Sequence, residues 1–444
     1  MTEYDLIVIG SGPGGYATAA EAARMGRRTM IVERDELGGT CLNRGCIPTK
    51  ALCRSAEVAM TVSSAAGYGV QVSGVSLDYT RAVARKDEVV AALREGVALK
   101  LKDVDVVRGD ARFVAPRVVE VNGEEYGATQ IIVATGSRAA VLDIPGASYA
   151  VDSDFMLRCY ELPQSLVIVG GGVIGMEFAS VLCAFGVEVT VLEYCPEILP
   201  GFDRDVAKRL RMAMKRRGVT VVTGAQVTSI SEDLTVTYLV KGKEKSVRGS
   251  MVLMAVGRRA VIPEGLEEQG VRIERGFIAT DSNMATDIPG VYAVGDVNGR
   301  CMLAHAATAQ GRVALGLDQP LDPVPAAVFT TPECAMTGLT EEACESSGID
   351  YATGSAIYRA NGKALASGEA DGLVKVIVTP DGSRILGCHI CGAHAADLIQ
   401  EVAVAQCAGL SAAEVARCIH GHPTLSELVQ AALNDVKYRQ VDNI

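Results

Sequence analysis

A glycine-rich turn that occurs twice in this chain constrains its fold more than any other feature. In the first copy, an apolar strand over 4–9 runs into Gly10-Ser11-Gly12-Pro13-Gly14-Gly15 and an alanine-rich helix follows. A second strand over 29–32 ends at Glu33. Such glycines let the backbone approach a pyrophosphate, and the N-terminus of the helix stabilises the phosphate charge. The acid can accept hydrogen bonds from both ribose hydroxyls. We therefore predict a dinucleotide site formed by Gly10, Gly12, Gly14, Gly15 and Glu33.

The second copy has the same order of elements. A strand over 166–169 leads into Gly170-Gly171-Gly172-Val173-Ile174-Gly175, a helix runs to about 185, and a strand over 187–192 ends at Glu193. Glu193 would repel a 2′-phosphate and the next arginine is Arg204, which favours NAD over NADP. Two such turns imply two cofactors held by two doubly wound α/β units. The residues predicted to bind the second cofactor here are Gly170, Gly172, Ile174, Gly175 and Glu193.

Two cysteines in a glycine-rich segment, 38–50, are the strongest candidates for reactive groups. Cys41 and Cys46 precede Pro48, a residue suited to the first turn of a helix. Thiolates at a helix N-terminus have a lowered pKa and are better nucleophiles at neutral pH. The 13 cysteines show no disulfide-scaffold spacing. This usage favours a reducing, cytoplasmic compartment in which any disulfide is catalytic.

The overall composition excludes several classes of partner. The 444 residues carry a net charge of −11 without any basic block, which argues against nucleic acid. No apolar run approaches the roughly 18 residues of a membrane span. The first residues lead almost directly into a strand, so we expect no signal peptide.

The rest of the chain predicts further elements. We expect a long amphipathic helix over 78–101, a buried strand over 131–137, a hairpin over 235–247 and a helix over 302–315. A proline-rich linker over 318–325 precedes the C-terminal part. There, strands over 374–378 and 385–391 alternate with helices over 395–408 and 425–433, an α+β pattern.

His422 and Glu427 form a candidate base and orienter. The unperturbed pKa of histidine lies close to neutral pH, and a nearby carboxylate can orient the imidazole and stabilise its charged form. An isolated His-Pro-Thr would more simply begin a helix, but the cysteine pair makes catalysis the stronger interpretation. His420 is left as an accessory or surface residue. Cys388-His389-Ile390-Cys391, with His394 nearby, lies on an alternating strand without a second Cys pair, so no metal site is predicted.

Taken together, the segment Gly39–Lys50, the two glycine turns and the His422 region resemble the class I pyridine nucleotide–disulfide oxidoreductases, a family of FAD flavoproteins. The resemblance covers nearly the whole chain. It implies that the first turn holds FAD, the second holds NAD, and Cys41 and Cys46 form the redox disulfide, with Cys46 next to the flavin. The further cofactor-binding positions that it implies are Gly39, Thr40, Lys50, Ala111, Thr135, Gly136, Ser137, Glu177, Val227, Gly257, Asp296 and Ala304.

The resemblance also implies an architecture. We expect two Rossmann-like dinucleotide-binding domains followed by an α+β dimerisation domain. The expected boundaries are 1–145 for the first part of the FAD domain, 146–258 for the NAD domain, 259–320 for the second part of the FAD domain, and 321–444 for the interface domain. In this family His422 and Glu427 act on the disulfide of the partner subunit, which implies a homodimer.

Two segments, 302–305 and 420–427, are similar to the branch of the family that oxidises dihydrolipoyl groups with NAD. This implies a lipoyl-bearing partner from a 2-oxo acid dehydrogenase or glycine cleavage complex. Two alternatives stay open: an NADPH-dependent reductase of a low-molecular-weight disulfide, and a structural subunit that only binds the cofactors. The segment 434–440 departs from the family pattern.

Overall fold

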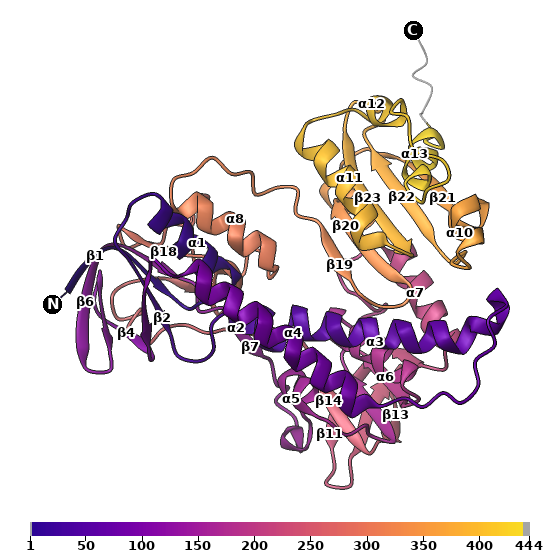
Figure 1. The fold of residues 1–444 in the computed structure, drawn as a ribbon, viewed down its shortest axis with the longest axis horizontal. Coiled ribbons are helices and arrows are strands. Elements are labelled where there is room, and N and C mark those ends of the chain that lie inside the picture. The colour runs from indigo at the N-terminus through magenta and orange to yellow at the C-terminus, as the bar shows by residue number, and fades with distance from the viewer. Residues whose placement is uncertain (1, 438–444) are drawn as a thin grey trace.

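The computed structural model describes residues 2–437, which form three packed units, each built on one main sheet (Figure 1). The atypical tail therefore lies partly outside the described residues, from residue 438 onward. Within residues 2–437, no helix combines the length and the apolar character that a membrane span requires.

The first unit contains a seven-stranded sheet in the order β3-β2-β1-β6-β5-β4, with β18 also paired to β6. β1 is parallel to both β2 and β6, as expected of a doubly wound unit. Its strands are β1 (Thr2–Ile9), β2 (Thr29–Glu33), β3 (Asp105–Arg108), β4 (Ala111–Ala115), β5 (Val118–Val121), β6 (Glu124–Val133) and β18 (Val291–Ala293). Its helices are α1 (Pro13–Arg24), α2 (Gly39–Arg44), α3 (Cys46–Ser64), α4 (Tyr79–Lys100) and α8 (Ala304–Ala314).

The second unit contains a four-stranded parallel sheet in the order β10-β9-β8-β14. A three-stranded antiparallel sheet, β11-β12-β13, follows β10 along the chain. The strands are β8 (Ser165–Val169), β9 (Glu188–Glu193), β10 (Thr220–Thr223), β11 (Ala225–Ile230), β12 (Thr235–Val240), β13 (Lys243–Arg248) and β14 (Met251–Met254). The helices are α5 (Ser153–Arg158), α6 (Val173–Ala184) and α7 (Arg204–Arg216).

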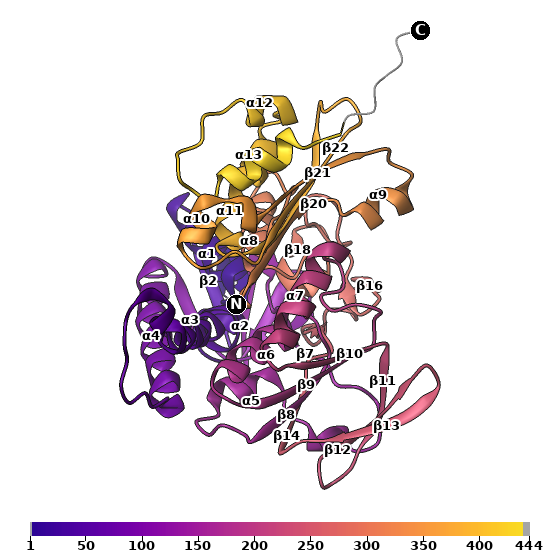
Figure 2. The ribbon, with the colours of Figure 1, turned by 90° about the vertical axis from the view of Figure 1, so that its right-hand side faces the viewer.

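The third unit is a five-stranded antiparallel sheet in the order β19-β20-β23-β22-β21, with helices packed on it (Figure 2). The strands are β19 (Ala326–Val328), β20 (Glu333–Gly338), β21 (Ala352–Ile357), β22 (Leu373–Val378) and β23 (Ile385–Gly392). The helices are α9 (Glu341–Ser347), α10 (Gly362–Ala366), α11 (Ala395–Cys407), α12 (Ala412–Ala416) and α13 (Glu427–Asn434). The predicted fold class, two Rossmann-like units and an α+β unit, is confirmed.

Short elements complete the chain. Two ribbons pair β7 (Ser137–Ala139) with β15 (Arg258–Ala260) and β16 (Ile273–Glu274) with β17 (Phe277–Ile278). Single 3₁₀ turns are η1 (Ala65–Tyr68), η2 (Ala147–Tyr149), η3 (Gly295–Asn298) and η4 (Tyr358–Ala360). The β7–β15 ribbon joins the first two units, because β7 follows the first sheet and β15 follows the second.

The predicted helices and the hairpin are confirmed, with ends shifted by a few residues. The helix expected over 78–101 is α4, and the Asp78 side chain caps it by accepting from the Arg81 amide at 2.9 Å. The strand expected over 131–137 ends at Val133, and the chain then turns through Gly136 at φ +68° into β7. Only glycine adopts such a conformation without strain, which explains the early end.

The expectation that β23 alternates between core and solvent was wrong. Residues 387–392 of this strand are all buried. β23 contacts α11 and also α7 of the second unit, so that both of its faces are covered. Within residues 2–437, no group of three or more His, Cys, Asp or Glu side chains is arranged to hold a metal ion.

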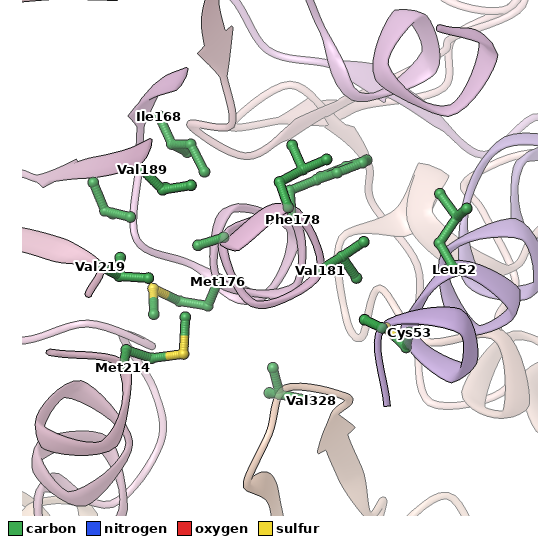
Figure 3. Packing of buried hydrophobic residues seen from close by; sticks show 14 of the residues in the cluster. Leu52, Cys53, Ile168, Met176, Phe178, Val181, Val189, Met214, Val219 and Val328 are labelled. Atoms are coloured by element: carbon green, nitrogen blue, oxygen red, sulfur yellow. The ribbon is translucent and has the colours of Figure 1, made fainter. Parts of the chain in front are cut away.

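One hydrophobic core extends across all three units (Figure 3). Figure 3 shows Met176, Phe178 and Val181 of α6 between Leu52 and Cys53 of α3 on one side and side chains of the second sheet on the other. Val328 of β19, with Cys334 and Cys391, joins the same cluster from the third unit. The helix that begins at Cys46 is therefore held by buried apolar surface from its neighbours as well as from its own unit.

Candidate active site

The first glycine turn forms a cradle between β1 and α1. Gly10 adopts φ +99°, and a Cβ there would lie 2.5 Å from the Ala134 carbonyl oxygen. A Cβ on Gly15 would lie 1.8 Å from the Gly10 carbonyl oxygen, so only glycine lets α1 approach β1 this closely. Gly12, before the first residue of α1, faces open space. An open, glycine-lined helix N-terminus is what a dinucleotide pyrophosphate requires, so these residues fit FAD.

The second turn repeats this geometry. Gly170 has φ +107° and a Cβ there would lie 2.4 Å from the Ala255 carbonyl oxygen. A Cβ on Gly175 would lie 2.1 Å from the Gly170 carbonyl oxygen, while Gly172 faces open space. Ile174 lies in the first turn of α6. This turn fits a second dinucleotide in the same way as the first turn does.

The two predicted ribose acids have a structural role that the sequence did not reveal. The buried Glu33 carboxylate accepts from the Ser11 amide at 2.8 Å and from the Ser11 hydroxyl at 2.6 Å. Glu193 is also buried and accepts from the Gly171 amide at 2.5 Å. Each acid therefore fixes the backbone of its own glycine turn.

The redox segment packs directly on the first turn. A Cβ on Gly39 would lie 2.6 Å from the Cα atom of Gly12, so the start of α2 touches the cradle. Thr40 and Cys41 follow within α2, and Cys46 is the first residue of α3. Cys46 is thus the first residue of α3, and Cys41 lies in the first turn of the short helix α2, so each cysteine is near a helix N-terminus. Pro48 lies in the first turn of α3, as predicted.

The two thiols lie side by side and differ sharply in acidity. The hydrogen bond that Cys41 makes to Cys46 is the main cause that lowers the pKa of Cys46 to about 7. Burial opposes this shift, and the positive charge of Lys50 adds to it. The same contact, followed by burial, raises the pKa of Cys41. Cys46 is thus the thiolate of the reduced pair.

Lys50 lies one turn beyond Cys46 and is held by an ion pair between two units. Its Nζ donates to both carboxylate oxygens of Glu177 on α6, at 2.9 and 3.0 Å. Glu177 also accepts from the Phe329 amide at 2.9 Å, and Lys50 Nζ lies 4.6 Å from the centre of the Phe329 ring. Lys50 and Glu177, two of the expected cofactor-binding positions, therefore form an ion pair that contacts the third unit.

Residues that follow the first sheet gather around Asp296 of η3. The Ser137 hydroxyl donates to Asp296, and Arg258 Nε donates to the Ser137 hydroxyl oxygen at 2.7 Å. Arg258 Nε also lies 3.8 Å from the Asp296 carboxylate. Arg258 was missed in the sequence, although its position directly after Gly257 was a usable signal. The structure thus brings Ser137 and Asp296 together and adds a cation to them.

The other predicted positions are spread over the two units. Ala304 is the first residue of α8, a helix that packs on α1 through Gly14 and Ala307. Ala111 begins β4 at the edge of the first sheet. Thr135 donates to the Val261 carbonyl at 2.5 Å. Val227 lies on β11 of the second unit.

His422 and Glu427 form a hydrogen-bonded dyad in the third unit. His422 Nδ1 lies 2.9 Å from Glu427 Oε1, and Glu427 Oε2 accepts from the Thr424 amide at 2.8 Å. The Thr424 amide, followed by His422, lowers the pKa of Glu427. The His422 side chain is 80% exposed. In both views α13 lies apart from α2, so one chain does not bring this dyad to its own cysteines (Figures 1 and 2).

Known proteins are similar to this chain along nearly its whole length. Residues 4–311 match the family described as pyridine nucleotide-disulphide oxidoreductase, and residues 324–433 match the dimerisation domain of the same family. The chain is 40% identical to a dihydrolipoyl dehydrogenase of Bacillus subtilis, over 97% of this chain and 98% of that protein. It is 41% identical to the dihydrolipoyl dehydrogenase of Thermus scotoductus, over 97% of both chains.

A solved structure has the same fold over the full length. The HOCl-induced flavoprotein disulfide reductase RclA of Escherichia coli is 30% identical and superposes with a TM-score of 0.86. The match covers 98% of this chain and all of that one. The resemblance stated from the sequence is therefore confirmed.

Proposed function

The chain belongs to the pyridine nucleotide-disulphide oxidoreductase family, and we propose that it is a dihydrolipoyl dehydrogenase. Such an enzyme oxidises a dihydrolipoyl dithiol to the lipoyl disulfide and reduces NAD+. The relatives named dihydrolipoyl dehydrogenase match along nearly their whole length, which supports this activity. As a member of the family, the chain is a flavoprotein oxidoreductase that uses FAD and NAD.

The observation that carries the proposal is the exposed His422–Glu427 dyad in a chain that also holds the Cys41–Cys46 pair. Glu427 fixes His422 through Nδ1, so that Nε2 is the nitrogen that accepts a proton. A protein that only bound the cofactors would need neither the dyad nor a cysteine with a lowered pKa. The alternative of a purely structural subunit is therefore not favoured.

We assign the following steps to these residues in the oxidised enzyme. His422 takes the proton of one substrate thiol, and the thiolate attacks Cys41 Sγ. The Cys41–Cys46 bond breaks, a mixed disulfide forms at Cys41, and Cys46 leaves as a thiolate beside Lys50. The second substrate thiol then attacks the substrate sulfur bound to Cys41, which closes the lipoyl disulfide and releases the Cys41 thiol. The substrate is oxidised by two electrons and the cysteine pair is reduced by two.

FAD, when bound, carries the electron pair from the cysteine pair to NAD+. We propose that the first turn, together with Glu33, Ser137 and Asp296, holds FAD and that the second turn, with Glu193, holds NAD. Lys50 supplies positive charge near the cysteine pair and, by the family resemblance, near the flavin. Gly39, Thr40, Ala111, Thr135, Gly136 and Ala304 are assigned to FAD, and Glu177 to the ion pair with Lys50 beside the flavin. Val227 and Gly257 are assigned to the region of the nicotinamide nucleotide.

We further propose a homodimer in which His422 and Glu427 serve the cysteines of the other subunit. The match of residues 324–433 to a dimerisation domain supports this arrangement. The boundaries 1–145, 146–258, 259–320 and 321–444 stay our proposal for the domains. A lipoyl-bearing protein of a 2-oxo acid dehydrogenase or glycine cleavage complex is the proposed partner, in the cytoplasm.

Steady-state kinetics of the purified holoenzyme test this function. Dihydrolipoamide with NAD+ should give NADH rapidly, whereas NADP+ should be a poor acceptor because Glu193 repels its 2′-phosphate. Cys46→Ser should keep FAD but abolish dithiol oxidation, while Cys407→Ser, an exposed cysteine of α11, should leave the rate unchanged. A wild-type enzyme that ignored dihydrolipoamide and reduced glutathione disulfide with NADPH would contradict the proposal.

A further inference from the structure

A second histidine–glutamate pair lies two residues before His422. His420 Nε2 lies 2.7 Å from Oε1 of Glu401 on α11, and His420 Nδ1 lies 2.9 Å from the Cys418 carbonyl oxygen. The His420 side chain is only 7% exposed, in contrast to the 80% of His422. The loop between α12 and α13 therefore carries one buried and one exposed imidazole.

Both ring nitrogens of His420 face atoms that can only accept. A carbonyl oxygen has no proton to give, and a glutamate carboxylate has none at neutral pH. A neutral imidazole has only one N–H. The lone pair of its other nitrogen would therefore face the lone pair of an acceptor oxygen, without a proton between them. The imidazolium has two N–H groups and satisfies both contacts. Turning the ring over would place carbon atoms against both acceptors and lose both bonds.

These contacts fasten the loop at several points. The Cys418 carbonyl that accepts from His420 also accepts from Gln430 Nε2 of α13, at 2.7 Å. Gln430 Nε2 donates to the Ala416 carbonyl as well, at 3.0 Å. His420 thus ties the start of the loop to α11, while Gln430 ties it to the helix that carries Glu427.

We propose that His420 is a positioning residue that works as an imidazolium: paired with Glu401, it fixes the loop from which His422 reaches the disulfide. The proposal rests on the function proposed above. It gives His420, which the sequence left as an accessory or surface residue, a defined role. His420 does not touch the reacting atoms, because its two nitrogens are occupied by Glu401 and Cys418.

The charged groups around His420 support this protonation state. Glu401 faces it from α11, Glu427 from α13, and His422 follows it on the same loop. Glu401 also approaches the buried Cys388 thiol of β23, whose pKa is raised mainly by burial. Burial alone would lower the pKa of His420, but the bonds to Glu401 and to the Cys418 carbonyl outweigh it, so the pKa is raised. The direction of this shift favours the imidazolium, as do the two acceptors that face the ring.

NMR of the wild-type holoenzyme with isotope-labelled histidine tests the protonation state directly. The chain has only five histidines, so His420→Gln identifies the signal by its loss. We expect both nitrogens of His420 to remain protonated at neutral pH and Glu401→Gln to abolish the second proton. A neutral His420 at neutral pH in the wild type would overturn the proposal.

Kinetics test the positioning role. Because a small misplacement of a catalytic group can cost up to about 10²-fold, we expect His420→Ala to lower kcat for dihydrolipoamide by roughly tenfold. NADH oxidation by an artificial acceptor that takes electrons from FAD should not change, since it needs no base at the disulfide. Gln400→Ala, a neighbouring exposed residue of α11, is the matched control and should have no effect.

Replacing Glu401 separates charge from shape. In Glu401→Gln the amide N–H can donate to a neutral Nε2, so this variant should keep more of the wild-type kcat than Glu401→Ala. In the wild type, kcat should fall at alkaline pH as His420 loses its second proton. Glu401→Gln should lack this fall. Equal losses in Glu401→Gln and Glu401→Ala, or a normal kcat in His420→Ala, would overturn the positioning role. An inactive wild type with a doubly protonated His420 would instead refute the proposed function and leave the protonation state standing.

Discussion

At the scale of single residues, the two cysteines differ in the pKa of their thiols, and this difference suits their roles. Cys46 is held as a thiolate by its neighbour's hydrogen bond and by Lys50, whereas Cys41 stays protonated. A thiolate is both the better leaving group when the disulfide is attacked and the better electron donor afterwards. This difference in acidity suits a disulfide that the substrate attacks at Cys41 and that passes its electrons on from Cys46.

The acidity of Cys46 gives the first prediction. Since its pKa is lowered to about 7, the thiolate is present above that pH and is lost below it. Alkylation of the reduced protein by iodoacetamide, followed by peptide mass spectrometry, should show Cys46 reacting with a midpoint near this pH. Lys50→Met should raise the midpoint and Glu177→Gln should lower it, because Lys50 lowers this pKa and Glu177 raises it. An unshifted midpoint in both variants would mean that the ion pair does not control the thiol.

The base gives the second prediction. His422→Ala should retain FAD and lose roughly 10²- to 10⁴-fold of kcat for dihydrolipoamide, the usual contribution of general-base catalysis. Glu427→Gln should lose less, because the amide still accepts from Nδ1 while its charge is gone. Steady-state kinetics at saturating NAD+ measure both variants. A near-normal rate in His422→Ala would place the base elsewhere.

The sequence predicted the residues whose roles depend on local spacing and missed those whose roles depend on tertiary contacts. The cysteines and the glycines of both turns lie in short motifs, so their positions followed from the chain alone. The bonds from Glu33 to Ser11 and from Glu193 to Gly171 close only when two strands lie side by side. Likewise, nothing in the sequence brings Glu401 to His420.

At the scale of elements, periodicity located helices and strands well and their burial less well. The amphipathic helix expected over 78–101 is α4, and the hairpin expected over 235–247 is formed by β12 and β13. The covering of β23 on both faces depends on α7, which belongs to another unit and lies far away in the sequence. The alternation of apolar and polar residues along a strand does not show which distant element covers its second face.

The close packing of helices on glycine gives the third prediction. In the NAD-free holoenzyme, Gly175→Ala should lower the stability of the second unit by about 1–3 kcal/mol, because its Cβ would meet the Gly170 carbonyl oxygen at 2.1 Å. Gly172→Ala should leave this stability unchanged, because nothing lies within 4 Å of its Cβ. Thermal unfolding measures both.

Gly175→Ala and Gly172→Ala should have the same effect on NAD binding. Both should weaken NAD binding and keep the content of FAD, Gly175→Ala by displacing α6 and Gly172→Ala by filling the space for the pyrophosphate. Titration with NADH measures the affinity. Tight NADH binding by Gly172→Ala would argue against a nucleotide at this turn.

At the scale of the whole molecule, the position of the dyad gives the fourth prediction. As homodimers, Cys46→Ser should be inactive and His422→Ala should keep about 1% of the wild-type rate or less. A hybrid dimer of the two, isolated with two different affinity tags, combines intact cysteines from one chain with an intact dyad from the other. If the sites are shared between subunits, it should recover about half of the wild-type rate. An inactive hybrid would mean that each chain completes its own site.

The core that extends across the three units limits how such a protein can be re-engineered. Leu52 of α3, Met176 of α6 and Val328 of β19 belong to one apolar cluster that all three units share, so the second unit cannot be removed without exposing part of that cluster (Figure 3). A chimera that exchanged only the second unit, to change the preferred nicotinamide cofactor, would leave mismatched surfaces against α3 and β19. Changing cofactor preference is therefore a task for point substitutions around Glu193, with the partners of α6 left as they are.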